Sequence, residues 1–465
     1  AALSLTPLEQ GLLARLDQQL STADKASAAD ARARQLLGAT RLTEAESAEL
    51  NQWLQARQAA RADEVHTLAA LLAATRAANA TRPQAGPSVP LGRLQALASR
   101  PRQRHVLHAH LVWGQEQLNL LTLSAGGQRL QRLALRRPDL DRDIGAFLDA
   151  LQQRGNVLPW AQLLYRQVGQ ALDEAARAQG ATEIKLWLDG GLRYLPFAAL
   201  HDGQRYLVQK YRLVLAPALA PPAAASTAPP PAPTRITAFG VSQALPGYAA
   251  LPAVGEELCA IVNGPVRGLN GLAAACRQAA AAQGTGPLPG EADLNQFFTE
   301  KRLRSATDAA AAAPRQPSLL HIGTHFVLRP GNIARSWLLL GDGQTLTLQA
   351  LRSLALHNTA LVTLSACQSG LPGAGANGVE VDGLPAALLG RGAQRVLASL
   401  WKVDDQHTAT LMRRFYAELA RRPGDFAGAL QAAQRASLGG QAGQASHPAH
   451  WAAFNLTEAG LQVPD

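Results

Sequence analysis

A cysteine and a histidine each follow an apolar run that is typical of a buried strand. Residues 361–364 are apolar or β-branched and lead through two small residues to Cys367. Residues 318–326, which read S-L-L-H-I-G-T-H-F, place His325 at the end of a second run, 42 residues before the cysteine. The carboxyl ends of parallel strands meet at one edge of a sheet, so we expect both side chains there. A thiol beside an imidazole base is an arrangement for nucleophilic catalysis.

The segment from His321 to the C-terminus resembles the CHAT family, the caspase-like peptidases related to separases. The motifs that carry the resemblance are H-I-G-T-H, S-W-L-L-L-G-D-G, L-S-A-C-Q-S-G, G-A-Q-R-V-L-A-S-L-W-K-V-D-D, R-R-F-Y-A-E-L and H-P-A-H-W-A-A-F. The resemblance implies a cysteine endopeptidase in which Cys367 is the nucleophile and His325 is the base. It also implies that the backbone N–H groups of Phe326 and Cys367 stabilise the oxyanion. No cofactor and no metal are expected.

Other titratable side chains have plainer interpretations. His321 lies in the middle of its strand and is expected to be a hydrogen-bonded core histidine. Cys259 and Cys276 have no histidine nearby in the sequence and are expected to be structural thiols. Thr324 and Asn332 are the only candidates for a third member of the site, and the dyad is able to work alone.

Three acidic residues are candidates for substrate recognition. Asp404 and Asp405 follow a predicted strand at residues 394–400 and can cap a helix predicted at residues 406–419. Their segment, W-K-V-D-D, is similar to a W-D-V-T-D segment of separases, which prefer arginine before the cut. The resemblance therefore favours Asp405, with Asp382 as a second candidate, as the carboxylate that would select Arg over Leu.

Composition limits the class of protein. The chain has 465 residues, of which 47% are apolar and 17% charged, so a globular protein of two or three domains is expected. Three cysteines without a C-x-x-C pair favour a reducing cytoplasm. Neither a signal segment nor a run of about 18 apolar residues is present in the sequence, so no membrane association is expected.

The formal net charge of +10 raises the question of nucleic-acid binding. The basic excess lies mostly within residues 83–220, and its densest parts, at residues 100–104 and 129–142, contain arginines without interleaved aromatic residues. A platform for stacked bases needs such aromatic residues. A solvated face, or a face for an acidic partner, is therefore the preferred interpretation.

The alternation of strands and helices predicts the α/β class, with a parallel sheet flanked by helices and an N-terminal α-helical module. The resemblance implies that this sheet is caspase-like and that a pseudo-caspase half precedes it. Helix-capping patterns at Thr6–Glu9 and Thr43–Glu46 mark the helical module, which is either a small bundle or the end of a helical repeat array. The predicted segments are the helical module at 1–82, a linker at 83–104, a scaffold half without cysteine at 105–220, a Pro/Ala-rich linker at 221–234 and a catalytic half at 235–465.

Three functions compete at this point. The first is an endopeptidase that cleaves a protein partner and is regulated by processing or by an activating protein that acts through the helical module. The Ala- and Gly-rich stretch from Gly271 to Gly290 is expected to be a mobile loop that takes part in this regulation. The second is a catalytically silent CHAT scaffold, and the third is a basic nucleic-acid binder.

Overall fold

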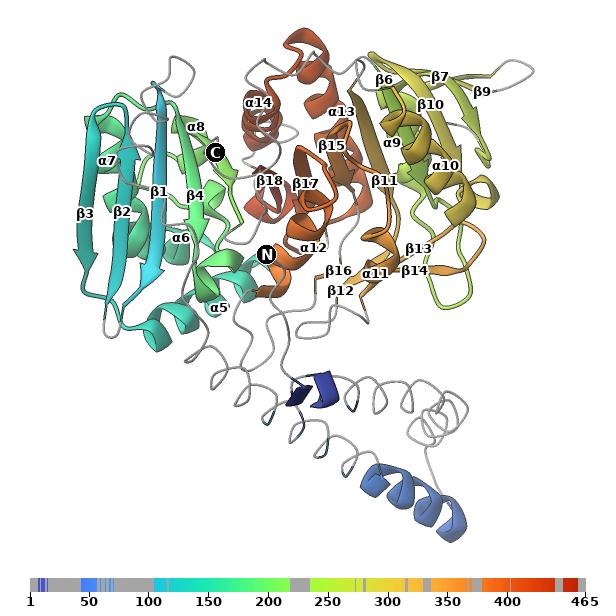
Figure 1. Cartoon of the computed structure of the whole chain (residues 1–465), viewed down its shortest axis with the longest axis horizontal. Coiled ribbons are helices and arrows are strands. Elements are labelled where there is room, and N and C mark those ends of the chain that lie inside the picture. The colour runs from blue at the N-terminus through green and yellow to red at the C-terminus, as the bar shows by residue number, and fades with distance from the viewer. Residues whose placement is uncertain are drawn as a thin grey trace. The chain divides into compact units, whose positions relative to one another are not determined.

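The structure is a computed structural model of the whole chain (Figure 1). It divides into two compact units, residues 1–88 and 89–465, which are described separately. The structure describes parts of residues 7–70, including all of 43–56. It also describes residues 104–114, 117–217, 235–271, 273–278, 282–313, 317–328, 336–365, 368–369, 379–401, 403–439 and 446–458. Among these residues, no helix is both long and apolar enough to cross a membrane.

The first unit contains a helix at residues 44–56. Its start has the capping box that the sequence predicts, because the Thr43 backbone N–H donates to Glu46 Oε2 (3.0 Å) and the Glu46 N–H donates to Thr43 Oγ1 (3.3 Å). This prediction is confirmed. Thr6 and Glu9, the ends of the other predicted cap, lie outside the described residues.

The second unit is built on a sheet of fourteen strands in the order β3-β2-β1-β4-β5-β18-β17-β15-β11-β6-β10-β7-β9-β8. Strands β10, β6, β11, β15 and β17 run parallel to their neighbours in this set, which is the predicted α/β class. The strands are β1 Val106–Trp113, β2 Leu118–Ser124, β3 Gly127–Leu133, β4 Glu183–Leu188, β5 Arg212–Leu215, β6 Arg235–Gly240, β7 Val262–Arg267, β8 Cys276–Gln278, β9 Ala282–Thr285, β10 Leu288–Leu294, β11 Ser318–Gly323, β15 Thr359–Leu364, β17 Arg395–Ser399 and β18 Phe454–Glu458.

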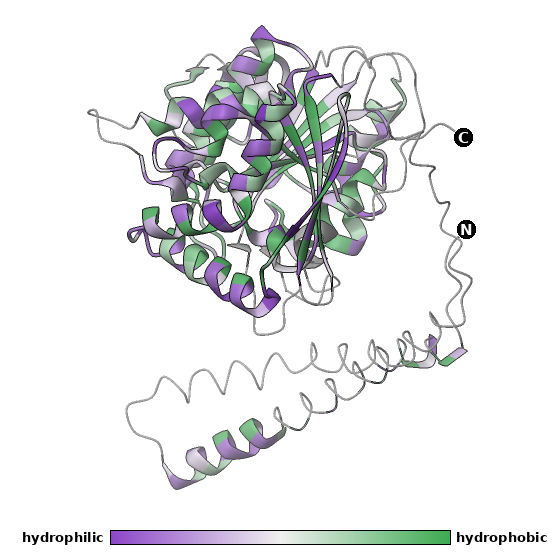
Figure 2. Ribbon diagram, turned by 90° about the vertical axis from the view of Figure 1, so that its left-hand side faces the viewer, coloured by the Kyte–Doolittle hydropathy of each residue, from purple (hydrophilic) through white to green (hydrophobic). Residues whose placement is uncertain are grey.

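Helices cover both faces of the sheet in residues 235–465, the half that is predicted to be catalytic. Alternate residues of β11 and β15 point to opposite faces, so Leu320 and Val362 share one buried cluster with α10, α11 and α12, while Leu319 and Leu361 share another with α9, α13 and α14. Figure 2 shows green, hydrophobic residues concentrated in the strands and purple, hydrophilic residues on many outer turns of the helices. The helices are α5 Arg137–Gln152, α6 Leu158–Leu164, α7 Gln170–Ala178, α8 Leu207–Lys210, α9 Pro252–Ile261, α10 Glu300–Ala311, α11 Leu348–Leu351, α12 Val379–Leu389, α13 Asp405–Arg421 and α14 Phe426–Leu438.

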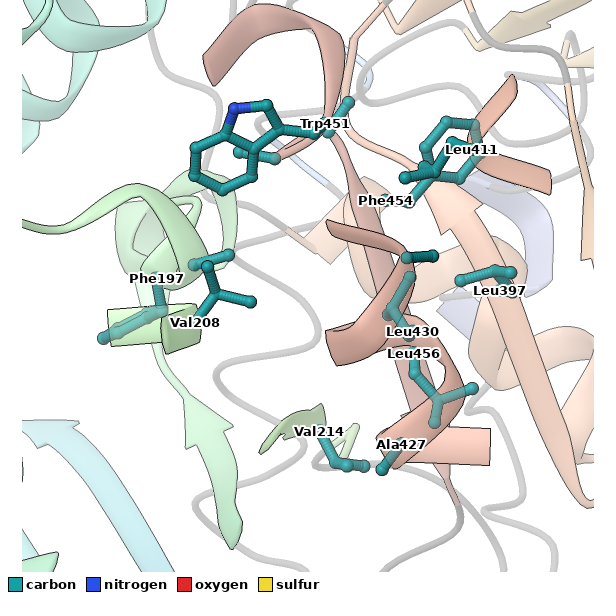
Figure 3. Close-up of a cluster of buried hydrophobic side chains, with 14 of the residues drawn as sticks. Phe197, Val208, Val214, Leu397, Leu411, Ala427, Leu430, Trp451, Phe454 and Leu456 are labelled. Atoms are coloured by element: carbon teal, nitrogen blue, oxygen red, sulfur yellow. The ribbon is translucent and has the colours of Figure 1, made fainter. Parts of the chain in front are cut away.

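The scaffold half and the catalytic half share the large sheet. Strand β5 of the scaffold half pairs in parallel with β18, the last strand of the chain, with Val214 opposite Leu456. The buried side chains at this junction, drawn in Figure 3, include Phe197, Val208, Val214, Leu430, Trp451, Phe454 and Leu456. The last strand of the predicted catalytic half therefore lies beside a strand of the predicted scaffold half.

A second, small sheet lies at the lower edge of the large one in Figure 1. Its order is β14-β13-β12-β16, with β12 Phe326–Leu328, β13 Trp337–Leu339, β14 Thr345–Thr347 and β16 Gln368–Ser369. Strand β12 follows β11 in the chain and β16 follows β15, so the small sheet continues both strands beyond the edge of the large sheet.

The stretch from Gly271 to Gly290 is not the loop that its composition predicts. It contains β8, β9 and the start of β10. A Cβ atom at Gly284 or Gly290 would collide with the backbone of Val262 or Ile236. These glycines therefore allow neighbouring backbones to approach closely, and their abundance does not indicate a loop.

Cys259 and Cys276 are structural, as the sequence predicts, but they are not thiols. The two residues form a disulfide that joins α9 to β8. Because 17 residues separate them, no C-x-x-C spacing marks the pair. Disulfides persist mainly in oxidising compartments, so the cysteine content no longer argues for a reducing cytoplasm.

Candidate active site

His325 lies just beyond the carboxyl end of β11 and is half-buried. Its Nε2 is 2.8 Å from the carbonyl oxygen of Ala249, and its ring centroid is 5.5 Å from that of Tyr248. A carbonyl oxygen only accepts hydrogen bonds, so Nε2 is the nitrogen that carries the hydrogen. The Nδ1 atom is then left to accept a proton from another group.

The segment that holds His325 is fixed by three local features. Gly247 has a φ of 81°, in the left-handed region that glycine adopts without strain, and it allows the turn before Tyr248. The Leu251 N–H donates to the Ser242 carbonyl oxygen (3.1 Å). At the start of α9, the Ala253 N–H donates to Asp405 Oδ2 (3.1 Å). This segment was not predicted from the sequence, because the atom that orients His325 belongs to the backbone and no side-chain type identifies it.

Ala366 and Cys367 lie outside the described residues, but Ser365 and Gln368 on either side of them are placed. Before them, β15 is parallel to β11 with Leu364 opposite Ile322, and the Ser365 N–H donates to the Ile322 carbonyl oxygen (2.8 Å). After them, Gln368 of β16 is opposite Val327 of β12. In the sequence, His325 lies between β11 and β12, and Cys367 lies between β15 and β16. Strand β11 pairs with β15 and β12 pairs with β16.

Phe326 is the first residue of β12, and its backbone N–H has a defined direction. Phe326 is opposite Leu338 of the antiparallel strand β13, and the Leu339 N–H donates to the His325 carbonyl oxygen (2.8 Å). In such a ladder Phe326 and Leu338 form a non-hydrogen-bonded pair, so the Phe326 N–H points away from β13. Strand β16, which begins directly after Cys367, lies on that side.

The predicted recognition acids have defined positions, except for one side chain. Asp404 caps α13, because its Oδ1 accepts the N–H groups of Gln406 (3.1 Å) and His407 (3.3 Å). Burial would raise the pKa of Asp404, but the hydrogen bonds from His407 outweigh it and hold the pKa below its usual value. Asp405, which is half-buried, binds α9 through Ala253. The side chain of Asp382, in α12, lies outside the described part of the chain.

Of the two candidates for a third member of the site, only Thr324 belongs to the described structure. The buried Thr324 donates its hydroxyl hydrogen to the Leu339 carbonyl oxygen (2.7 Å), and Asn332 lies outside the described residues. His321 is a buried, hydrogen-bonded histidine, as the sequence predicts, with Nδ1 3.1 Å from the Tyr416 hydroxyl oxygen. Among the described residues, no group of three His, Cys, Asp or Glu side chains could hold a metal ion.

The match to a family model agrees with the sequence motifs. The CHAT domain model matches residues 158–459, which is more than half of the chain. A search of curated proteins finds no match. Three similar solved structures are the Arg specific cysteine proteinase gingipain R (8% identity, 68% of each chain covered, TM-score 0.33), the Saccharomyces cerevisiae separase–securin complex (10% identity, 79% of this chain and 31% of that chain, TM-score 0.41) and the complex of RgpB pro- and mature domains from Porphyromonas gingivalis (10% identity, 70% of this chain and 77% of that chain, TM-score 0.36). On the match of the family model, the chain belongs to the CHAT domain family.

Proposed function

We propose that this chain is a cysteine endopeptidase that cleaves a protein partner, with Cys367 as the nucleophile and His325 as the general base. The observation that carries the proposal is the His325 ring. Its Nε2 is held by the Ala249 carbonyl, which leaves Nδ1 as the acceptor. The ring lies between β11 and β12, and the strands that flank Cys367 in the sequence, β15 and β16, pair with these two strands.

The proposed reaction has two halves. His325 Nδ1 takes the thiol proton, the Cys367 sulfur attacks the carbonyl carbon of the peptide bond, and the carbonyl electrons move to oxygen. The N–H groups of Phe326 and Cys367 stabilise this oxyanion, and its collapse breaks the C–N bond as the imidazolium protonates the leaving amine. A water molecule then gives its proton to His325 and attacks the thioester, which releases the acid and restores the thiol.

Peptide cleavage by matched variants tests the proposal. The parent chain, Cys367→Ala and His325→Ala are incubated with a random peptide library, and products are read by mass spectrometry. Each variant is expected to lose at least about 1,000-fold in kcat, since both members of a dyad are needed for attack. His105→Ala is the control, because this exposed histidine lies in the scaffold half.

Two results would contradict the proposal. One is cleavage by either dyad variant at the rate of the parent chain. The other is a folded parent chain that cleaves no peptide and whose Cys367 resists iodoacetamide, which would favour the catalytically silent CHAT scaffold instead.

We extend the proposal to specificity for a basic residue before the scissile bond, with Asp405 as the acid that faces it. Among the described residues, its Oδ2 accepts the Ala253 N–H and its Oδ1 has no hydrogen bond. The free oxygen could therefore bind a guanidinium. Asp405→Asn is expected to lower kcat/KM at least about 10-fold more for an arginine peptide than for its leucine analogue.

Asp404→Asn is the matched control for specificity. Asparagine also caps helices well, so this neighbouring substitution keeps the start of α13 without changing the selectivity ratio. An equal loss on both peptides in Asp405→Asn would leave Asp405 as a residue that only anchors α9.

A further inference from the structure

Glu257 is a carboxylate in the interior of the catalytic half. It lies on α9, is 2% exposed, and faces the carboxyl ends of β11 and β15. Its Oε1 accepts the hydroxyl hydrogen of Ser365 (2.7 Å). The same oxygen lies 2.9 Å from Nε2 of His321. One carboxylate oxygen therefore contacts both strands.

The contacts continue on the far side of His321. Its Nδ1 lies 3.1 Å from the hydroxyl oxygen of Tyr416 on α13, and that oxygen lies 2.8 Å from Oγ1 of Thr363. The strand register places His321 opposite Thr363. All five side chains are buried. Four separate elements, α9, β11, β15 and α13, thus meet through one polar network.

Burying such a polar network costs free energy, and apolar side chains would fill the same volume without that cost. An isolated carboxylate in the interior costs several kcal/mol, and apolar residues of similar volume often give equal or greater stability. Polar groups that satisfy one another do fix one arrangement of the surrounding elements. The network is therefore suited to setting geometry.

The position of the network shows which geometry it sets. Ser365 is two residues before Cys367, and His321 is four residues before His325. Glu257 itself belongs to the helix whose leading segment supplies the Ala249 carbonyl. The Glu257 side chain therefore contacts residues near the ends of both strands, and its helix follows the segment whose carbonyl binds the His325 ring.

We propose that Glu257 is a positioning residue that holds the ends of β11 and β15 so that the His325 imidazole faces the Cys367 thiol. This inference rests on the proposed function, because it assigns a task to the same dyad. Displacing a reacting group by about 1 Å costs on the order of 100-fold in rate, so a small shift of either strand end is enough to matter.

The test compares Glu257→Gln with Glu256→Gln in the full-length chain. Glutamine keeps the size of Glu257 and one carbonyl oxygen but removes the charge beside His321. Glu256 is the neighbouring residue of the same helix, and it accepts the Ala275 N–H (3.1 Å) away from the two strand ends. The first measurement is kcat and KM on a cleaved peptide. The second is the rate of Cys367 alkylation by iodoacetamide between pH 5 and 9.

Glu257→Gln is expected to lower kcat by about 10- to 100-fold with KM changed by less than about twofold. Its alkylation profile is expected to shift to higher pH, because a displaced imidazolium stabilises the thiolate less. Glu256→Gln should match the parent in both measurements. A purely structural role of Glu257 predicts a lower Tm with unchanged kcat and profile, and this result would overturn the inference.

Ser365→Ala keeps the test decisive if Glu257→Gln does not fold. It removes one hydrogen bond to Glu257 and leaves His321 untouched, so an intermediate loss of about 3- to 10-fold in kcat is expected. Unchanged kcat would count against the inference. The proposed function fails separately if the parent's alkylation profile is that of an ordinary thiol and His325→Ala does not alter it.

Discussion

Two histidines four residues apart, one within β11 and one just beyond its end, have different surroundings. His321 is fully buried between Glu257 and Tyr416, whereas His325 is half-buried and bound to a backbone carbonyl. The sequence predicts both roles from position, because one residue lies in mid-strand and the other at the strand end. It could not predict the groups that hold the rings, since Glu257 and Ala249 come from a distant part of the chain.

A third histidine gives a pH-dependent contribution to stability. His108 on β1 is buried, and among the described residues neither ring nitrogen has a hydrogen bond. Burial, with Lys185 and His110 nearby, lowers its pKa from 6.5 to about 3. Between these pH values the unfolded chain binds the extra proton, so stability present above pH 6.5 is lost as the pH falls.

Replacing His108 by phenylalanine should remove this loss. The urea midpoint of His108→Phe is expected to fall less than that of the parent chain between pH 6.5 and 4.5, because no proton is taken up on unfolding at this position. His105→Phe, at an exposed site, should show the same change of urea midpoint with pH as the parent chain. If the midpoints of the parent and His108→Phe changed equally with pH, the His108 ring would not be buried in its neutral form.

At the scale of elements, α9 organises the candidate site. Its leading segment holds His325, its start binds Asp405, and its inward face carries Glu257. Apolar periodicity is a local property, so the sequence predicts the alternation of strands and helices in the catalytic half. Which strand ends a helix contacts depends on long-range packing, and the sequence pattern therefore does not reveal it.

The disulfide between Cys259 and Cys276 should stabilise α9 against the β8–β9 hairpin. Closing a loop of this length contributes about 3 kcal/mol to the free energy of unfolding. Cys259→Ser is therefore expected to lower the urea midpoint of the oxidised chain, and a reducing agent should lower the parent's midpoint equally without affecting the variant. A parent chain whose midpoint does not respond to reductant would contradict the pairing.

At the scale of the whole molecule, residues 89–465 form one compact unit. The Pro/Ala-rich segment at 221–234 lies between the predicted scaffold and catalytic halves in the sequence. Strands β5 and β18 nevertheless join these halves in one sheet. The sequence could not predict this pairing, since more than 200 residues separate the two strands.

Deleting residues 1–82 should leave the thermal unfolding of the large unit intact, because the two units are compact by themselves. We expect the deletion to change the basal peptidase rate or its response to an activating protein. Circular dichroism and peptide cleavage measure the two effects. No change in either rate would make the helical module a spacer.

In the proposed function, Cys367 attacks a peptide carbonyl with the help of His325. The most direct test of this attack is the intact mass of the chain after incubation with peptidyl acyloxymethyl ketones that carry arginine or leucine, followed by peptide mapping. We predict one adduct per chain on Cys367, formed at least about 100-fold more slowly in His325→Ala. No adduct on Cys367 in the folded parent chain, or equal rates in the parent and His325→Ala, would contradict it.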